Sequence, residues 1–359
     1  MTNKFHFFSY RPAVRFHITK QLEGLGWERA AHAKEALFTD DNLTLNDEIS
    51  LHLEYKHLLA ALVAKHCPDV MPVTYYINDQ NYAEVFAKMT YDFYLPHGRY
   101  EPDIPGLKWI LKPSMLNNGD EIRLFNNIEE LKNHYQTTKR LGGDHVVQRY
   151  VPNPDLIDGR KYTFRIPLIV TNYTGIYLYR EGYINISAYP FNLEDGLKNR
   201  KVHLTNYVLD GEFAHIEQCS TNTLKDFENT YQQMSQIIVS VMKGLLRDHP
   251  SYLQPRPHHV FEIFGVDFIQ DQNKKVWLLE MNQGPDAPTF EDNVLTTVLW
   301  NKFWADIIDD FVLPIACQVP PKRSYTHFSK LLSRQQSYSY IKNTWDGLIR
   351  GLKKRLPGS

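Results

Sequence analysis

The feature that most constrains this chain is a pair of apolar segments joined by a short polar stretch. Residues Phe261–Gln270 and Val276–Asn282 flank the polar residues Asp271–Lys275. Two such runs around a short polar turn predict a β-hairpin. The first run is apolar at nearly every position, which is typical of a strand that is covered on both faces. The sequence therefore predicts a hairpin inside a buried sheet.

The register of this hairpin brings two carboxylates together. If the turn is centred so that paired residue numbers sum to 547, Asp267 faces Glu280 and Gly265 faces Asn282. Opposed side chains have Cβ atoms only about 5 Å apart, so two carboxylates placed in this way repel each other. We therefore expect positive charge between them. Glu280 and Asn282 lie on one face of the strand, because side chains alternate.

The residue types at this position favour a magnesium ion. Asp267, Glu280 and Asn282 offer carboxylate and carboxamide oxygens, and no Cys or His stands beside them. Mg²⁺ prefers such hard oxygen ligands and completes its shell with water and nucleotide phosphates. The alternative is that both acids lie on a solvated face. The apolar residues on either side of Asp267 argue against it.

The remaining patterns predict an α/β protein of two or three domains, as a length of 359 residues allows. Strand, helix and strand alternate from Trp109 to Val151, and the polar, Pro-rich stretch Pro96–Pro105 marks a domain boundary. Further patterns predict a strand at Lys4–Tyr10, helices at Pro12–Leu25, Ile49–Lys65, Asn81–Met89 and Thr223–Leu246, and two long antiparallel strands within Lys161–Ala188 that turn at Asn172–Gly175.

Six motifs, taken in order, resemble those of the tubulin tyrosine ligase-like family, a group of the ATP-grasp superfamily. They are Trp109–Pro113, Gln148–Val151, Asp158–Tyr162 with Arg165, His203–Asn206, Phe261–Phe268 and Leu278–Asn282. Each motif alone is weak, but the ordered set is specific. The resemblance runs from about Lys4 to Pro288.

The resemblance implies an ATP-grasp fold that encloses a nucleotide between mixed and antiparallel sheets. The implied parts are an N-terminal α/β domain at residues 1–98, a central subdomain at 99–152, a C-terminal subdomain at 153–316 and a basic extension at 317–359.

The resemblance also implies roles for single residues, with ATP and Mg²⁺ as cofactors. Lys112 and Lys161 are expected to contact phosphates, and Arg165 to grip a carboxylate or developing negative charge. The adenine is expected on Gln148, Arg149, Tyr150 and Val151, with Thr205 and Asn206 near the phosphates or the acceptor, and His203 holding the turn. The catalytic set is Arg165, Lys161 and Glu280, and the metal ligands are Asp267, Glu280 and Asn282.

Three positions depart from the family pattern. Thr163 stands where the family usually has Asp, and Asn185 stands where it has Arg. Glu121 occupies a loop position where glycine is common, and a close backbone approach to phosphates is easiest for glycine. We expect these departures to change the recognised substrate more than to abolish activity.

The net charge of −1 hides an uneven distribution. From Gln318 to Ser359 the chain has nine basic residues and one acidic residue. Residues 341–355 show the spacing of a basic amphipathic helix, which either packs on the core or binds weakly to an anionic membrane or an acidic protein tail. No nucleic-acid-binding module is recognisable, so no nucleic-acid partner is expected.

The chain is expected to be a cytoplasmic protein. Its first twelve residues lack a secretory signal pattern, and no window approaches about 18 consecutive apolar residues. Delivery into another cell is an open alternative. The three cysteines have no CxxC spacing, so neither a disulfide framework nor a zinc site is expected.

Three functions compete. The first is an enzyme that joins a free amino acid to a protein acceptor, such as tubulin or another protein with an acidic tail, through an acyl phosphate. The second is an ATP-grasp ligase for a small peptide or metabolite. The third is a nucleotide-binding scaffold without ligase activity.

Overall fold

The computed structural model describes residues 2–8, 11–93, 107–116, 119–137, 140–193, 197–206, 208–209, 212–213, 215–285, 287–289 and 293–334. The expected boundary at Pro96–Pro105 and the amphipathic helix at 341–355 therefore lie outside the described residues. None of the helices within these ranges combines the length and the apolar character that crossing a lipid bilayer requires.

The helices are α1 (Pro12–Gly24), α2 (Asp47–Glu54), α3 (Lys56–His66), α4 (Tyr82–Phe93), α5 (Ile128–Gln136), α6 (Arg200–His203), α7 (Phe227–Asp248), α8 (Asn301–Ile307) and α9 (Leu313–Ala316). The strands are β1 (Lys4–His6), β2 (Glu28–Arg29), β3 (Phe38–Thr39), β4 (Thr74–Ile77), β5 (Trp109–Pro113), β6 (Arg123–Phe125), β7 (His145–Arg149), β8 (Leu156–Ile157), β9 (Arg160–Thr171), β10 (Gly175–Tyr179), β11 (Tyr183–Pro190), β12 (Val208–Leu209), β13 (Glu212–Phe213), β14 (Glu217–Ser220), β15 (Phe261–Gln270), β16 (Val276–Gln283) and β17 (Phe328–Ser333). The fold is thus mixed α/β, as predicted.

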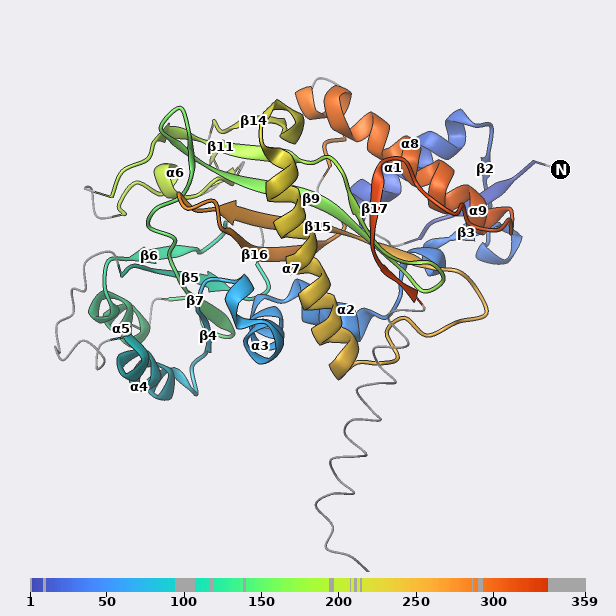
Figure 1. The fold of residues 1–359 in the computed structure, drawn as a ribbon. Helices are drawn as coiled ribbons and strands as arrows, with labels where there is room; N and C mark the ends of the chain where they lie inside the picture. The colour runs from blue at the N-terminus through green and yellow to red at the C-terminus, as the bar shows by residue number, and fades with distance from the viewer. Residues whose placement is uncertain are drawn as a thin grey trace, which may run out of the picture.

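The long strand β9 organises the larger sheet, which has eight strands among the described residues. One edge of β9 pairs with β11 and then with β10, and the other edge pairs with β15, which carries β16. The helix α7 crosses one face of this sheet (Figure 1). The hairpin β15–β16 is therefore an internal part of the sheet, as its apolar sequence predicted.

Alternation along β9 separates two cores and leaves room for a site. Ile166, Leu168 and Val170 belong to the core that includes the buried face of α7. Ile169 faces the other way, into a core built with α1, α8 and the π-helical turns that flank α8. Towards the start of β9 that second face becomes polar, with Arg165 the first of its polar residues. The cavity described below opens there.

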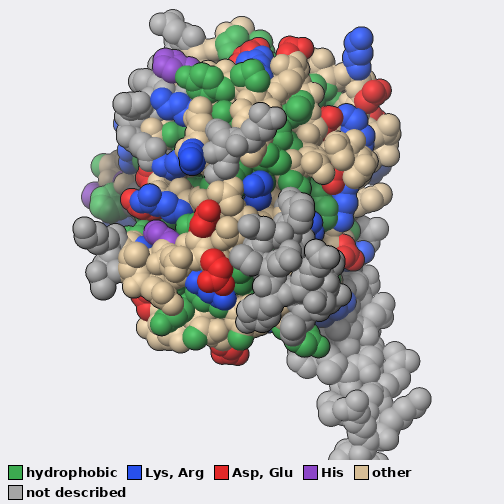
Figure 2. Space-filling model, turned by 90° about the vertical axis from the view of Figure 1, so that its left-hand side faces the viewer, with side chains coloured by type: hydrophobic (Ala, Val, Ile, Leu, Met, Phe, Trp, Pro, Cys, Tyr) green, Lys and Arg blue, Asp and Glu red, His purple; other side chains and the backbone are tan. Residues whose placement is uncertain are grey.

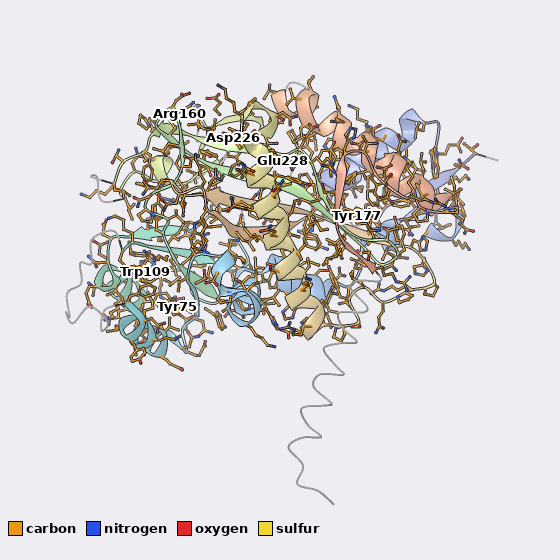
Figure 3. All side chains as sticks on the ribbon, viewed as in Figure 1. Tyr75, Trp109, Arg160, Tyr177, Asp226 and Glu228 are labelled. Carbon is orange, nitrogen blue, oxygen red and sulfur yellow. The ribbon has the colours of Figure 1, made fainter. Side chains whose placement is uncertain are left out.

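A smaller sheet, in the order β4-β7-β5-β6, packs against α4 and α5. Its core includes Trp109, which is fully buried, and Tyr75, whose ring centroid lies 6.3 Å from that of Trp109 (Figure 3). Strand β4 lies within the first predicted domain, residues 1–98, yet it pairs with β7 along its whole length. The domain boundaries stay a prediction.

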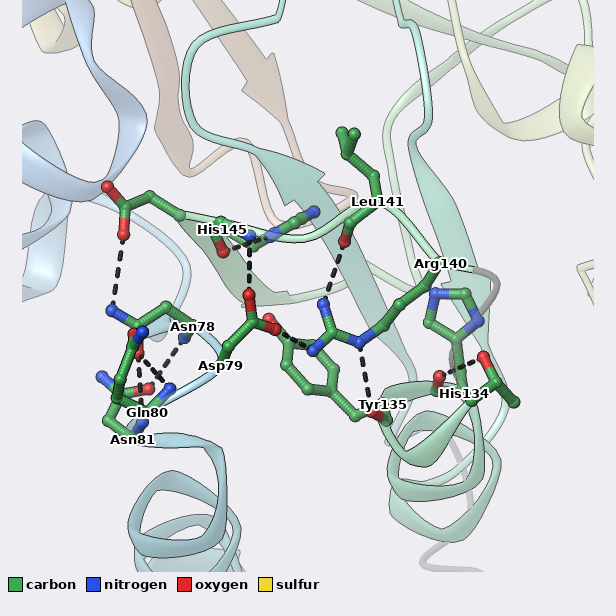
Figure 4. Close-up of polar contacts among 12 residues, drawn as sticks. Asn78, Asp79, Gln80, Asn81, His134, Tyr135, Arg140, Leu141 and His145 are labelled. Carbon is green, nitrogen blue, oxygen red and sulfur yellow. Dashed lines mark hydrogen bonds and ion pairs between the residues drawn. The ribbon is translucent and has the colours of Figure 1, made fainter.

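The connection into β7 is fixed by Asp79 (Figure 4). Its carboxylate accepts a hydrogen bond from the amide of Gly143 at 3.0 Å and forms an ion pair with Arg140. Arg140 in turn donates to the carbonyl of Tyr135 at 3.1 Å, at the end of α5. These contacts anchor the loop that leads into β7, the strand that carries Gln148 into the cavity.

Two predicted elements are interrupted. The expected helix Ile49–Lys65 is two helices, because Tyr55 is extended at φ −75° and ψ 120°. The expected second long strand of Lys161–Ala188 is two strands, β10 and β11. It breaks at Gly182, which exchanges two hydrogen bonds with Thr221. The turn at Asn172–Gly175 lies where it was predicted.

The surface charges on the face shown in Figure 2 are mixed. Lys and Arg side chains alternate there with Asp and Glu. On this face of the described residues, neither positive nor negative charge dominates, in agreement with the small net charge of the whole chain.

Candidate active site

A cavity of about 580 Å³ lies between the two sheets. Its wall includes every residue that the sequence predicted for the site: Lys112, Gln148, Arg149, Tyr150, Val151, Lys161, Arg165, Thr205, Asn206, Asp267, Glu280 and Asn282. These residues come from six separate segments of the chain. The structure therefore brings the whole predicted set to one place, while their individual roles stay predictions.

Asp267, Glu280 and Asn282 form one corner of the cavity, called the acidic corner below, and their strands pair in the predicted register. Asp267 pairs with Glu280 and Gly265 with Asn282. The Nδ2 atom of Asn282 lies 3.5 Å from an oxygen of Asp267 and 3.3 Å from an oxygen of Glu280, so the three side chains converge.

The register shifts by one residue between Asp267 and Phe268, which pairs with Leu278. Between the turn and the site, β16 contains one extra residue, which forms a bulge. The centre of the turn therefore lies half a residue from the predicted one, while the pairing at the site is as predicted.

Positive charge stands beside both carboxylates, as their repulsion required. Arg165 donates from Nε and Nη2 to the two oxygens of Asp267, at 2.6 Å each. The ammonium group of Lys56 lies 3.4 Å from Glu280. Burial opposes ionisation of Glu280, but Lys56, Lys112 and Arg165 together hold its pKa well below the usual range. Burial raises the pKa of Asp267 to about 6, against the opposing effect of Arg165.

The donor set fits a magnesium ion better than a softer metal. The corner offers two carboxylates and one carboxamide, and Glu280 is held ionised, as a metal ligand must be. Within the described ranges there is no group of three His, Cys, Asp or Glu side chains that could hold a metal. A Mg²⁺ ion here would therefore depend on Asn282 and on non-protein oxygens for the rest of its ligands.

Two buried lysines, Lys112 and Lys161, line the cavity. The Nζ atom of Lys112 donates to Gln148 at 2.9 Å, and that of Lys161 donates to the carbonyl of His203 at 2.6 Å. Burial lowers the pKa of Lys112 to about 8 and that of Lys161 to about 7. Two cations held in a buried wall are suited to binding a polyanion, which would restore their charge.

This lowering predicts a pH-dependent affinity for Mg·ATP. Above pH 7 the empty site loses protons from Lys161 and then from Lys112, whereas bound phosphate favours the protonated forms. Binding must then take up protons, so the Kd should rise about tenfold between pH 6.5 and pH 8. Titration calorimetry at several pH values measures this rise. A Lys161→Arg variant, which keeps its charge, should show a flatter profile, and a Kd that is constant with pH would contradict the assignment.

The segment expected to hold adenine uses part of its backbone inside the protein. The amide of Arg149 donates to the carbonyl of Val73, and the amide of Tyr150 donates to the carbonyl of Lys108. Backbone hydrogen bonds to a base would therefore have to use the amide of Val151 as donor and carbonyl groups of the segment as acceptors.

The turn His203–Asn206 meets the loop that contains Gly119 and Glu121, called the glycine loop below, at the cavity wall. Thr205 shares a 2.7 Å hydrogen bond with Thr163, and a Cβ atom on Gly119 would lie 2.9 Å from Asn206. Glu121 adopts a φ of 54°, a conformation that favours glycine, at the loop position where the family commonly has glycine. The loop thus has the backbone conformation of a glycine at a position where this chain has glutamate.

Among the cavity residues that sequence reasoning missed are Lys56, Arg11 and Trp300. Lys56 follows the break at Tyr55 and donates to the carbonyl of Leu116 at 2.8 Å, so it joins the acidic corner to the glycine loop. The sequence shows one continuous helical pattern across Tyr55, so nothing in it indicated that Lys56 would face the cavity. Arg11 and Trp300 lie far from every motif in the sequence.

The two facing sheets and the cavity between them define the ATP-grasp class of fold. The family model described as the tubulin-tyrosine ligase family matches residues 55–327. The chain belongs to this family. The match starts later than the resemblance that we inferred from about Lys4, so it leaves out β1–β3, α1 and α2.

Individual relatives agree with this assignment. The probable tubulin polyglutamylase TTLL9 of Mus musculus is 29% identical over 251 residues, which cover 54% of this chain and 52% of that protein. A probable tubulin–tyrosine ligase of Schizosaccharomyces pombe is 28% identical over 242 residues, covering 57% and 58%. Tubulin glycylase 3D of Tetrahymena thermophila is 29% identical over 195 residues, covering 49% and 18%. The chain thus spans about half the length of the first of these relatives.

Proposed function

We propose that this protein uses Mg·ATP to activate a carboxylate and joins it to an amine, adding a free amino acid to a protein acceptor. The observation that carries the proposal is the content of one cavity. It holds two buried lysines together with the converging side chains of Asp267, Glu280 and Asn282. This arrangement suits a nucleotide triphosphate whose terminal phosphate reaches the acidic corner.

The proposed reaction has two steps. An oxygen of the substrate carboxylate attacks the γ-phosphorus, the bond to the bridging oxygen breaks, and ADP leaves. The unprotonated amine then attacks the acyl carbon, phosphate leaves, and the surplus proton of the nitrogen passes to it. Lys112 and Lys161 would hold the phosphates, and Arg165 would offset charge at the reacting carboxylate. Mg²⁺ held by Asp267, Glu280 and Asn282 would supply Lewis-acid stabilisation of phosphate charge.

The protein acceptor is proposed from the relatives, whose names describe tubulin polyglutamylases, a glycylase and a tyrosine ligase. The departures at Thr163 and Asn185 bear on recognition. Thr163 bonds to Thr205, and Asn185 accepts a 2.8 Å hydrogen bond from Gln218. Both polar groups are therefore satisfied inside the protein, which supports a substrate different from that of relatives with charges there. The amphipathic helix predicted at 341–355 keeps both of its interpretations, packing on the core and weak docking to an anionic membrane or an acidic protein tail.

Phosphate release tests the proposal against its two alternatives. The purified protein is incubated with Mg·ATP and each of the free amino acids in turn, with and without tubulin or a cell extract. We expect release that depends on one amino acid and on a protein acceptor. Release without any protein acceptor would favour the small-substrate ligase. Tight binding of Mg·ATP without release under any condition would favour the scaffold.

A further inference from the structure

The helix α3 takes its N-terminal cap from another part of the chain. Its first two residues are Lys56 and His57, and the residue before them, Tyr55, makes no capping hydrogen bond with its side chain. Amides in the first turn of a helix have no partner inside the helix, so they need acceptors from elsewhere. Ser114 supplies acceptors for two of them. This serine follows β5 directly, and only 1% of it is exposed.

Ser114 holds the first turn of α3 with both its backbone and its side chain. Its carbonyl accepts from the amide of Lys56 at 3.3 Å, and its Oγ accepts from the amide of His57 at 3.2 Å. The same hydroxyl contacts Nδ1 of His57. Burial lowers the pKa of His57, so the ring is neutral and its Nδ1 can accept the hydroxyl hydrogen. The amide of Ser114 donates to the carbonyl of Asp144 at 2.8 Å, just before β7, which fixes the cap to the smaller sheet.

The segment that begins at Ser114 also holds the other end of Lys56. The Nζ atom of Lys56 donates to the carbonyl of Leu116 at 2.8 Å, two residues after Ser114. Residues 114–116 therefore bind this lysine at its backbone and at the tip of its side chain. Held in this way, the ammonium group lies 3.4 Å from Glu280 in the acidic corner. A lysine side chain is long and flexible, so both attachments are needed to keep its charge in one place.

We propose that Ser114 is a positioning residue for the ligase reaction, a role that rests on the proposed function. By capping α3, it sets the place of the Lys56 ammonium group beside Glu280. In the proposed reaction, negative charge shifts on the γ-phosphoryl group beside this corner. A cation stabilises such charge efficiently when its position is fixed before the reaction begins. Ser114 is not among the residues that line the cavity, so it acts through Lys56 and touches no substrate.

A helix cap with no link to the cavity provides the matched control. Asn127 caps α5, where its Oδ1 accepts from the amide of Glu130 at 2.9 Å. This asparagine is not part of the cavity wall. Loss of either cap should destabilise the protein by a similar, small amount, because each variant loses one capping side chain. Only the loss of the Ser114 hydroxyl should displace a cation of the site.

The first test compares Ser114→Ala and Asn127→Ala in amino-acid-dependent phosphate release. Ser114→Ala should lower kcat about tenfold, since a displacement of about 1 Å in a catalytic group can cost up to about 10²-fold. The KM for the amino acid and the Kd for Mg·ATP should stay within about threefold of wild type, because the residues proposed to bind both remain. Asn127→Ala should keep the wild-type kcat, although both variants lower the urea midpoint by similar amounts. A wild-type kcat in Ser114→Ala would show that the serine only caps a helix, and would overturn the proposal.

A double-mutant cycle tests whether Ser114 acts through Lys56. Lys56→Met keeps the length of the side chain, removes its charge and should itself lower kcat. In that background Ser114→Ala should change kcat less than twofold, because the ammonium group that the serine positions is gone. A further tenfold loss there, or a wild-type kcat in Lys56→Met alone, would mean that Ser114 acts by another route and would overturn the proposal. Wild-type protein that binds Mg·ATP but releases no phosphate under any condition would instead refute the proposed function, and this inference with it.

Discussion

A Glu280→Gln variant should lose amino-acid-dependent phosphate release by about 10³-fold while it keeps its fold, the size of effect expected when one preorganised electrostatic contact is lost. Glutamine has nearly the same shape, so the change removes one charge from the acidic corner. That charge balances Lys56, which lies 3.4 Å away, and opposes Asp267 across the hairpin. Without it, the corner would lack one of the two carboxylates proposed as ligands for Mg²⁺.

The readout separates chemistry from binding. We expect the Kd for Mg·ATP to weaken no more than about tenfold, because Lys112 and Lys161 remain. Glu129→Gln is a suitable control, since Glu129 lies exposed on α5 and pairs only with Lys132 among the described residues. It should behave as wild type. If Glu280→Gln keeps more than a tenth of the wild-type rate, the acidic corner does not perform the chemistry.

The largest effect on stability is expected for Gly182→Ala. A Cβ atom on Gly182 would lie 2.3 Å from the backbone oxygen of Arg165 and 2.3 Å from Cδ1 of Ile166. The oxygen belongs to the backbone of the central strand β9 and cannot swing away, and Cδ1 of Ile166 ends a side chain that is fully buried in the core. We expect the free energy of unfolding to fall by about 3 kcal/mol, the upper range for overpacking. Urea denaturation measures it.

Gly24→Ala provides the comparison for this variant. Gly24 is the last residue of α1, and a Cβ atom there meets nothing within 4 Å. Alanine should therefore be neutral or stabilise by up to about 1 kcal/mol, because it has the higher helix propensity. If the two variants have the same urea midpoint, the close packing of β11 against β9 is not a determinant of stability.

The acidic corner could be predicted because its information is local. Two apolar runs and one polar turn determine a hairpin, and alternation then determines which side chains share a face. Even so, the predicted turn centre was wrong, and Asp267 still faces Glu280 only because a bulge in β16 compensates. Pattern reasoning has no access to bulges, since they change the pairing without changing the residues.

The missed residues depend on contacts between distant parts of the chain. Arg11 reaches the cavity through Gln283, 272 positions away, and no periodicity records such a contact. Lys56 reaches it because Tyr55 interrupts a helix whose apolar pattern continues without a break. The hydrogen bond from the amide of Lys56 to the carbonyl of Ser114 accompanies this break. Tertiary contacts of this kind override a local pattern.

The mass of the protein acceptor shows directly whether a free amino acid becomes covalently joined to it. Tubulin incubated with the protein, Mg·ATP and the active amino acid is analysed by intact-protein mass spectrometry, with Glu280→Gln as the blank. We expect a mass increase equal to one or more residues of that amino acid, absent from the blank. Phosphate release at full rate with no change of mass in tubulin or in any protein of a cell extract would contradict it.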